Sequence, residues 1–109
     1  MRIEHVTLLV KNREATLDFF KRRLGFDYKF VGEHAWVIVG EQYIHITENS
    51  GSPISNTFYH FAVECDDFED YITKIKSEGV EIEDETPGSN IFIRDLDGNL
   101  IEFTKPWKP

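Results

Sequence analysis

The sequence predicts an α+β fold made of two βαβββ units, each with a curved mixed sheet. Three observations lead to this prediction. The first half shows a strand, a helix and three further strands, and this order recurs in the second half. Similar residues of the two halves are separated by a nearly constant number of positions. A polar stretch rich in Gly, Pro and Ser separates the halves at residues 49–56.

The first unit opens with a run of β-branched residues and Leu at 3–10, which is typical of a strand. Asn12 is suited to cap a following helix, and Gly25 is suited to end it in a left-handed conformation. Between them, apolar residues recur at helical spacing: Leu17, Phe20 and Leu24. The sequence therefore predicts one helix directly after the first strand.

Three more strands are predicted at 26–31, 35–39 and 42–47, with a short turn at Gly40-Glu41 between the last two. His34 falls in the polar turn before the second of them, where we expect a surface residue. Unit one then covers about 1–48, the linker 49–56 and unit two 57–109, all within a single domain of residues 1–109.

The second unit repeats this order. A strand is predicted at 58–65, a helix capped by Asp66 or Asp67 and ended at Gly79, and strands at 80–83, 90–94 and 99–104. The pairs His5 and His60, Leu17 and Ile72, and Phe20 and Ile75 are each 55 positions apart. A fixed offset between like residues indicates an internal duplication.

Composition excludes several function classes. The net charge is −8 and the pI about 4.9, which disfavours binding to nucleic acid or to an anionic membrane surface. Cys65 is the one cysteine, so no internal disulfide can form, and we expect it to act as a small apolar residue. Without a signal-like or membrane-spanning segment in the sequence, we expect a cytoplasmic protein.

Strand alternation separates two kinds of side chain. In the opening and closing strands of each unit, one face is apolar and suited to pack on a helix. The opposite face carries a metal-ligand type of residue in each strand: His5, His45, His60 and Glu102. Each residue alone could be an ordinary strand residue, but their equivalent positions favour one divalent ion in a cleft between the sheets. Because imidazole dominates the set, we expect zinc, nickel, cobalt or iron.

Several segments resemble the vicinal oxygen chelate superfamily, which includes glyoxalase I, fosfomycin-modifying thiol transferases, extradiol dioxygenases and bleomycin-binding proteins. These are the first-strand stretch around His5, the helix leading into Leu24-Gly25-Phe26, and the stretch from His60 to Val63. The most specific is the ending from Phe92 to Glu102, with Leu96 in place of the usual proline. The resemblance covers nearly the whole chain and implies a glyoxalase-like fold around a metal cleft.

The resemblance also implies roles for residues. His5, His60 and Glu102 match the metal ligands of the family, while His45 stands where glyoxalase I has an acidic ligand. In the mechanism that this implies, Glu102 or His45 would move a proton of the substrate. Leu9 stands where glutathione-dependent relatives have an arginine, although Asn49 matches an asparagine that helps hold glutathione there. Apart from the resemblance, we expect four aromatic residues of the sequence to form a dry wall of the cleft: Tyr43, Trp36, Phe58 and Phe92.

The expected function is metal-dependent Lewis-acid chemistry on a small molecule with neighbouring oxygens, as in an isomerase, lyase or thiol transferase. A homodimer is expected, because a unit of about 55 residues buries little apolar surface and carries only two of the four ligands. The alternatives are a bleomycin-type binding protein without catalysis and an extradiol dioxygenase.

Overall fold

The computed structural model describes residues 3–48 and 58–106, and both predicted units are found there. The predicted linker at 49–56, including Asn49, lies outside the described residues. In the described part of the chain, no helix has the length and apolar character needed to span a membrane.

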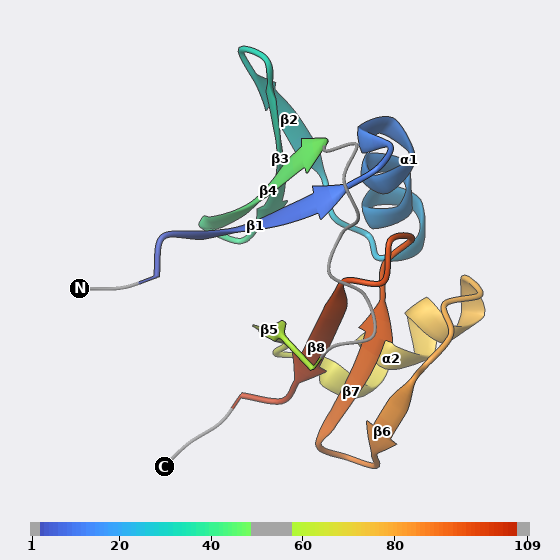
Figure 1. Cartoon of the computed structure of the whole chain (residues 1–109). Coiled ribbons are helices and arrows are strands. Elements are labelled where there is room, and N and C mark those ends of the chain that lie inside the picture. Colours follow the sequence, from blue (N-terminus) through green and yellow to red (C-terminus); the bar gives the residue numbers. More distant parts are fainter. Residues whose placement is uncertain (1–2, 49–57, 107–109) are drawn as a thin grey trace.

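Each unit forms a mixed four-stranded sheet (Figure 1). In the first sheet the order is β1-β4-β3-β2, where the strands are β1 (His5–Val10), β2 (Tyr28–Val31), β3 (His34–Val39) and β4 (Gln42–Glu48). In the second the order is β5-β8-β7-β6, where the strands are β5 (His60–Glu64), β6 (Asp84–Thr86), β7 (Asn90–Arg94) and β8 (Leu100–Thr104). The opening strand of each unit pairs in parallel with the closing strand, which confirms the predicted α+β fold of two like units.

The first helical segment differs from the single helix that the sequence predicts. Asn12 caps α1 (Arg13–Asp18) by accepting a hydrogen bond from the Ala15 amide at 2.9 Å, as expected. The chain then widens into a π-helical segment, η1 (Phe19–Arg23). Phe19 and Phe20 are both buried there with their rings edge to face. We attribute the wider turn to the burial of these two adjacent aromatic side chains.

The helix of the second unit, α2 (Phe68–Ser77), begins and ends where the sequence predicts. Gly25 and Gly79 follow the two helical segments with φ angles of 81° and 83°, a left-handed conformation that favours glycine. The helix ends are therefore set by equivalent residues in both units.

The prediction of a strand at 80–83 is wrong, because the strand of this region is β6 (Asp84–Thr86). Val80 is buried and Ile82 packs against the core, so these apolar residues serve the helix-to-strand connection. The paired strand begins later, at the exposed Asp84, which lies opposite Phe92. His34 also differs from expectation: it is the first residue of β3, opposite Val31, although it is exposed as predicted.

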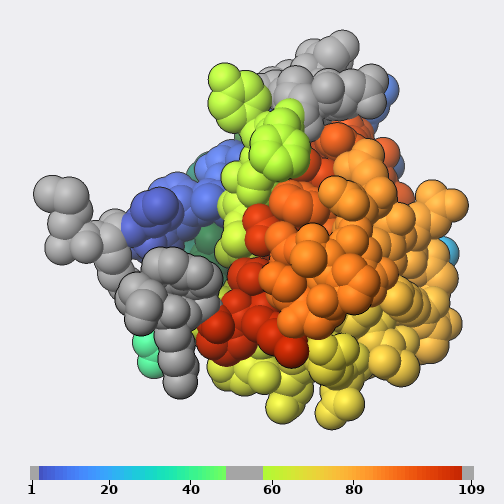
Figure 2. All heavy atoms as spheres, turned by 90° about the horizontal axis from the view of Figure 1, so that it is seen from below, coloured from blue at the N-terminus to red at the C-terminus, as the bar shows by residue number. Residues whose placement is uncertain are grey.

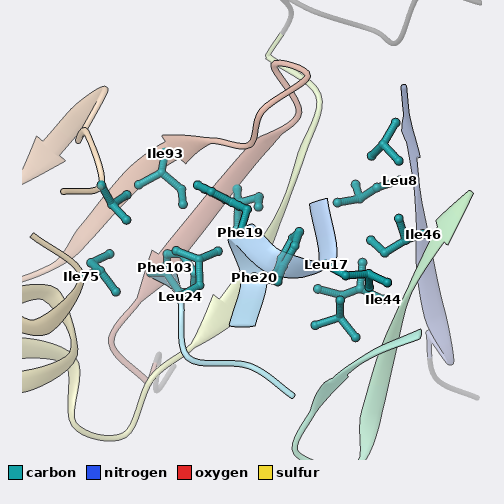
Figure 3. Packing of buried hydrophobic residues seen from close by; sticks show 14 of the residues in the cluster. Leu8, Leu17, Phe19, Phe20, Leu24, Ile44, Ile46, Ile75, Ile93 and Phe103 are labelled. Atoms are coloured by element: carbon teal, nitrogen blue, oxygen red, sulfur yellow. The ribbon is translucent and has the colours of Figure 1, made fainter. Parts of the chain in front are cut away.

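One apolar core joins the two units (Figure 3). α1 and η1 lie between the sheets: Leu17 packs near Ile44 of the first sheet, and Phe19 and Leu24 lie near Ile93 and Phe103 of the second. The core thus occupies the helix-facing side of both sheets. The other face of each sheet, which carries the predicted ligand residues, points away from this core.

Candidate metal centre

The second sheet holds a close imidazole and carboxylate pair. His60 on β5 and Glu102 on the neighbouring β8 lie with Nε2 and Oε1 3.2 Å apart. The other nitrogen of His60, Nδ1, lies 2.8 Å from the Phe58 carbonyl oxygen. The second oxygen of Glu102, Oε2, accepts a hydrogen bond from the Asn90 side chain at 3.0 Å. Each side chain is thus held by a hydrogen bond at the atom that does not face the other, Nδ1 of His60 and Oε2 of Glu102.

This geometry suits a divalent ion. A carbonyl oxygen can only accept, so Nδ1 of His60 carries the proton that it donates to Phe58. In the neutral ring Nε2 is then a bare acceptor, and it faces a carboxylate oxygen that is also an acceptor. A proton on Nε2 would satisfy this contact as an ion pair, and a divalent ion held by both groups would do so as well. Backbone carbonyls commonly orient metal-bound histidines in this way. The donor set therefore fits a metal half-site.

Two aromatic rings flank His60. Phe58 and Phe92 lie with ring centroids 4.9 Å and 5.1 Å from that of His60, and 5.7 Å from each other. Phe92 belongs to the same sheet face, because it lies opposite Glu102 in the β7–β8 register. The two rings thus lie beside His60, although Phe58 is 73% exposed and neither ring lines the groove described below.

The first sheet holds the other two predicted residues. His5 Nδ1 is hydrogen-bonded to a carboxylate oxygen of Glu4, which leaves its Nε2 available as a ligand. The His45 ring stacks on that of His5 with centroids 3.8 Å apart and on that of Trp36 with centroids 4.5 Å apart. His5 and His60 are therefore oriented by hydrogen bonds, whereas His45 is held between two rings.

Lys29 closes the outer side of this aromatic cluster. Its Nζ donates a hydrogen bond to the Tyr43 hydroxyl at 3.1 Å and lies 4.7 Å from the centre of the Tyr43 ring. Tyr43 and Trp36 are in contact, with ring centroids 5.0 Å apart. The predicted wall residues thus form two clusters, one on each sheet.

Two side chains singled out in the sequence have shifted pKa values, His45 at the site and Cys65 beside the core. Burial, followed by the neighbouring His5, lowers the pKa of His45, which favours a neutral imidazole. Burial, together with Asp66 and Glu64, raises the pKa of Cys65 to about 11. Its thiol packs against the core and stays protonated at neutral pH, as expected of a small apolar residue.

The four predicted ligand residues form two pairs within one chain. His5 and His45 lie on the first sheet, and His60 and Glu102 lie on the second. Over residues 3–48 and 58–106, no group of three or more His, Cys, Asp or Glu side chains is close enough to hold one ion. The cleft expected to unite all four ligands is therefore not found within the described part of a single chain.

A groove nevertheless runs between the edge strands of the two sheets. Residues of β1 and β5 line it together, including His5 and His60. Figure 2 shows these two segments, blue and yellow-green, beside one another on this face. The groove also contains three carboxylates, from Glu4, Glu41 and Glu64, and no Lys or Arg is among its described lining residues.

Sequence reasoning missed two residues of the site. Asn90 orients Glu102, and Glu4 orients His5. Asn90 could have been found from strand alternation, since it lies on the same face of its strand as Phe92. Glu4 lies inside the strand predicted at 3–10, where alternation places it on the apolar face opposite His5; the paired strand begins only at His5, so its side chain can turn to that ring.

Comparison with known proteins supports the fold and the family. Fosfomycin resistance protein FosX of Listeria monocytogenes is 27% identical over 116 residues, covering 93% of this chain and 86% of the relative. Metallothiol transferase FosB of Staphylococcus epidermidis is 29% identical over 112 residues, with 93% and 81% covered. A solved virulence protein from Salmonella typhimurium has a TM-score of 0.81 at 25% identity, with 98% of both chains covered.

A glyoxalase family protein from Bacillus anthracis has the same fold, with a TM-score of 0.85 at 21% identity and with 98% of this chain and 96% of that chain covered. The family model of the Glyoxalase/Bleomycin resistance protein/Dioxygenase superfamily matches residues 2–103. The resemblance seen in the sequence is thereby confirmed, and the chain belongs to the Glyoxalase/Bleomycin resistance protein/Dioxygenase superfamily.

Proposed function

We propose that this chain is a metal-dependent enzyme that acts on a small molecule with two neighbouring oxygen atoms. The observation that carries the proposal is the facing pair of His60 Nε2 and Glu102 Oε1, each oriented by its own hydrogen bond. The relatives support it. FosB is named a metallothiol transferase, and a FosX structure contains Mn(II) with 1S,2S-dihydroxypropylphosphonic acid, a vicinal diol.

The candidate ligands are His5, His45, His60 and Glu102, and the ion would be zinc, nickel, cobalt or iron, with manganese added because a relative binds it. A bound divalent ion supplies Lewis acidity to substrate oxygens. The chain's own groups orient and move protons. Asn90 holds one oxygen of Glu102, so the other can bind the ion or accept a proton from substrate. His45, as a neutral imidazole, is the second candidate proton acceptor.

A homodimer would complete the site. The ligand pairs lie on the sheet faces directed away from the shared core, and β1 and β5 are edge strands bordering one groove. Edge strands have unpaired backbone groups that a second copy can cover. In the proposed arrangement, His5 of one copy joins His60 and Glu102 of the other, which gives two equivalent sites around a two-fold axis.

Mixing variants tests this arrangement. His5→Ala and Glu102→Ala proteins should each lose tight metal binding as pure samples. After subunit exchange, a mixture should regain about one quarter of the wild-type sites, because half of the dimers are then heterodimers with one complete site each. A mixture that regains no metal binding, or a monomer in analytical ultracentrifugation that still binds metal tightly, would overturn the shared site.

The charge of the groove restricts the substrate class. Its carboxylates would repel an anion, and Arg94 on the second sheet is already paired with Glu83 at 2.8 Å. Leu9 also replaces the expected glutathione anchor. We therefore expect a neutral substrate, such as an α-hydroxycarbonyl or an epoxide, and poor turnover of the glutathione hemithioacetal of methylglyoxal.

The test is an activity panel on metal-loaded protein, covering hemithioacetals, fosfomycin with several thiols, neutral epoxides and catechols under oxygen. Glu102→Gln, which removes the carboxylate charge while keeping its shape, is the control that should be inactive. Efficient glutathione-dependent isomerisation would refute the inference from Leu9. Catechol cleavage with iron would show a dioxygenase instead.

A second function is favoured by the acidic groove. A non-catalytic, bleomycin-type protein would bind a cationic drug there through Glu4, Glu41 and Glu64. Tight binding of such a drug by metal-free protein, without turnover in the panel, would support this alternative.

For either function we propose a cytoplasmic location, since Cys65 is the only cysteine of the sequence and is a free thiol.

A further inference from the structure

Three rings on the first sheet form a continuous column. Trp36 on β3 stacks on His45 of β4 with planes 3° apart, and His45 stacks on His5 of β1 with planes 10° apart. The strands lie side by side in the order β1-β4-β3, so the column crosses the sheet face. Both faces of the His45 ring are therefore occupied by other rings.

This column limits which nitrogens can share an ion. An imidazole nitrogen binds a metal through a lone pair that lies in the ring plane, at about 2.0–2.1 Å for zinc. The centroids of His5 and His45 are 3.8 Å apart in nearly parallel planes, so the two planes do not meet at any nearby point. An ion bound in the plane of one ring would lie outside the plane of the other. The stacked pair can thus provide only one ligand.

His5 is the better placed of the two. Its Nδ1 is bound to the Glu4 carboxylate, the arrangement that orients a metal-bound histidine, and the residue lines the groove that His60 also lines. In the described part of the chain, His45 has no such hydrogen bond on either ring nitrogen, and its contacts are the two stacked rings.

We propose that His45 is a positioning residue rather than a metal ligand, and that the Trp36–His45 stack fixes the ring plane of His5 for metal binding. This inference rests on the proposed metal-dependent function and assigns the ligand role to His5, His60 and Glu102. The pattern of alternating strand faces places all four residues alike, and the ring planes separate His45 from the rest.

Metal titration of three variants tests the inference. His45→Phe keeps an aromatic ring in the column but has no nitrogen, and it should bind Co(II) within about threefold of wild type with an unchanged visible absorption spectrum. His45→Ala removes the ring, and its affinity should fall by about 10- to 100-fold, the range seen for groups that orient ligands. His5→Ala should lose tight binding altogether.

Thermal unfolding of the metal-free variants, followed by circular dichroism, checks that each remains folded. If His45→Phe loses Co(II) as completely as His5→Ala, or shows a changed Co(II) spectrum, then His45 is a ligand and the inference is wrong. If His45→Ala binds as tightly as wild type, the positioning role is wrong. If the wild-type protein binds no divalent ion at all, the proposed function fails first, and this inference fails with it.

Discussion

Asp95 is the residue on which the turn between β7 and β8 depends. Its carboxylate accepts hydrogen bonds from the amides of Asp97 and Asn99 at 2.9 and 2.8 Å, and from the Asn99 side chain at 2.9 Å. Asn99 also donates to the Leu9 carbonyl at 3.1 Å, at the end of β1. The motif that resembles the family ending therefore ties the second unit to the first strand of the chain.

Asp95→Ala should lower the free energy of unfolding by about 1–3 kcal/mol, because it leaves partly buried donors of the turn without a partner. The loss should depend on pH. Burial raises the pKa of Asp95 above its ordinary value of 3.8, although its hydrogen bonds oppose this shift. Because the pKa of Asp95 is higher in the folded state, protonation of this carboxyl stabilises the folded protein. This contribution to the free energy of unfolding is fully present below pH 3.8 and is lost as the pH rises through the folded pKa.

The difference between wild type and Asp95→Ala in urea unfolding should thus be larger near pH 4 than at pH 7. NMR titration of the Asp95 carboxyl carbon gives the folded pKa directly. A midpoint at or below the ordinary value would contradict the prediction.

Thr16 is a buried residue of α1 whose hydroxyl has no hydrogen-bond partner among the described residues. Thr16→Val replaces that hydroxyl with a methyl group of similar size, so the free energy of unfolding should rise by about 1 kcal/mol. Thr73→Val is the matched control in α2, because the Thr73 hydroxyl is exposed and donates to the Glu69 carbonyl. Urea unfolding of both variants checks the difference, and a destabilised Thr16→Val would show that the hydroxyl is satisfied in solution.

At the scale of elements, η1 is the segment that couples the sheets. It places Phe20, which is 1% exposed, in the middle of the core. Phe20→Ala should lower the free energy of unfolding by about 3–5 kcal/mol, through lost burial and the cavity that remains.

Phe30 on β2 provides the comparison, because it is 57% exposed and contacts the Arg13 guanidinium. Phe30→Ala should cost less than about 1 kcal/mol. Equal losses for the two variants in chemical unfolding would mean that η1 does not occupy the core as described.

At the scale of the whole molecule, the units are joined by aromatic contacts and a partly buried hydrogen bond. Tyr71 of α2 donates its hydroxyl to the Leu24 carbonyl at 2.7 Å, and the rings of Phe26 and Phe103 stack with centroids 6.3 Å apart. Burial raises the pKa of Tyr71, so its hydroxyl remains a donor at neutral pH. The continuous core predicts that the units unfold together.

Tyr71→Phe should lower stability by about 1 kcal/mol and reduce amide-exchange protection to the same degree in both units. Hydrogen exchange resolved by segment measures this. Tyr59→Phe, at a position that is 81% exposed, is the control and should change nothing. Loss of protection confined to α2 and its sheet would show that the units are independent.

The sequence by itself determined the two βαβββ units, the caps at Asn12, Gly25 and Gly79, and the sheet face on which each ligand candidate lies. These follow from local propensity and from the two-residue period of a strand, both of which can be read from neighbouring residues. Tertiary structure decided the rest. Phe19 and Phe20 are both buried only through a π-helical turn, and β6 begins at Asp84 because Val80 and Ile82 are drawn into the core. The division of the four ligand candidates into two pairs and the stacking of His45 on His5 also belong to the tertiary structure. Both depend on how strands that are distant in the sequence are placed in space, which neighbouring residues do not reveal.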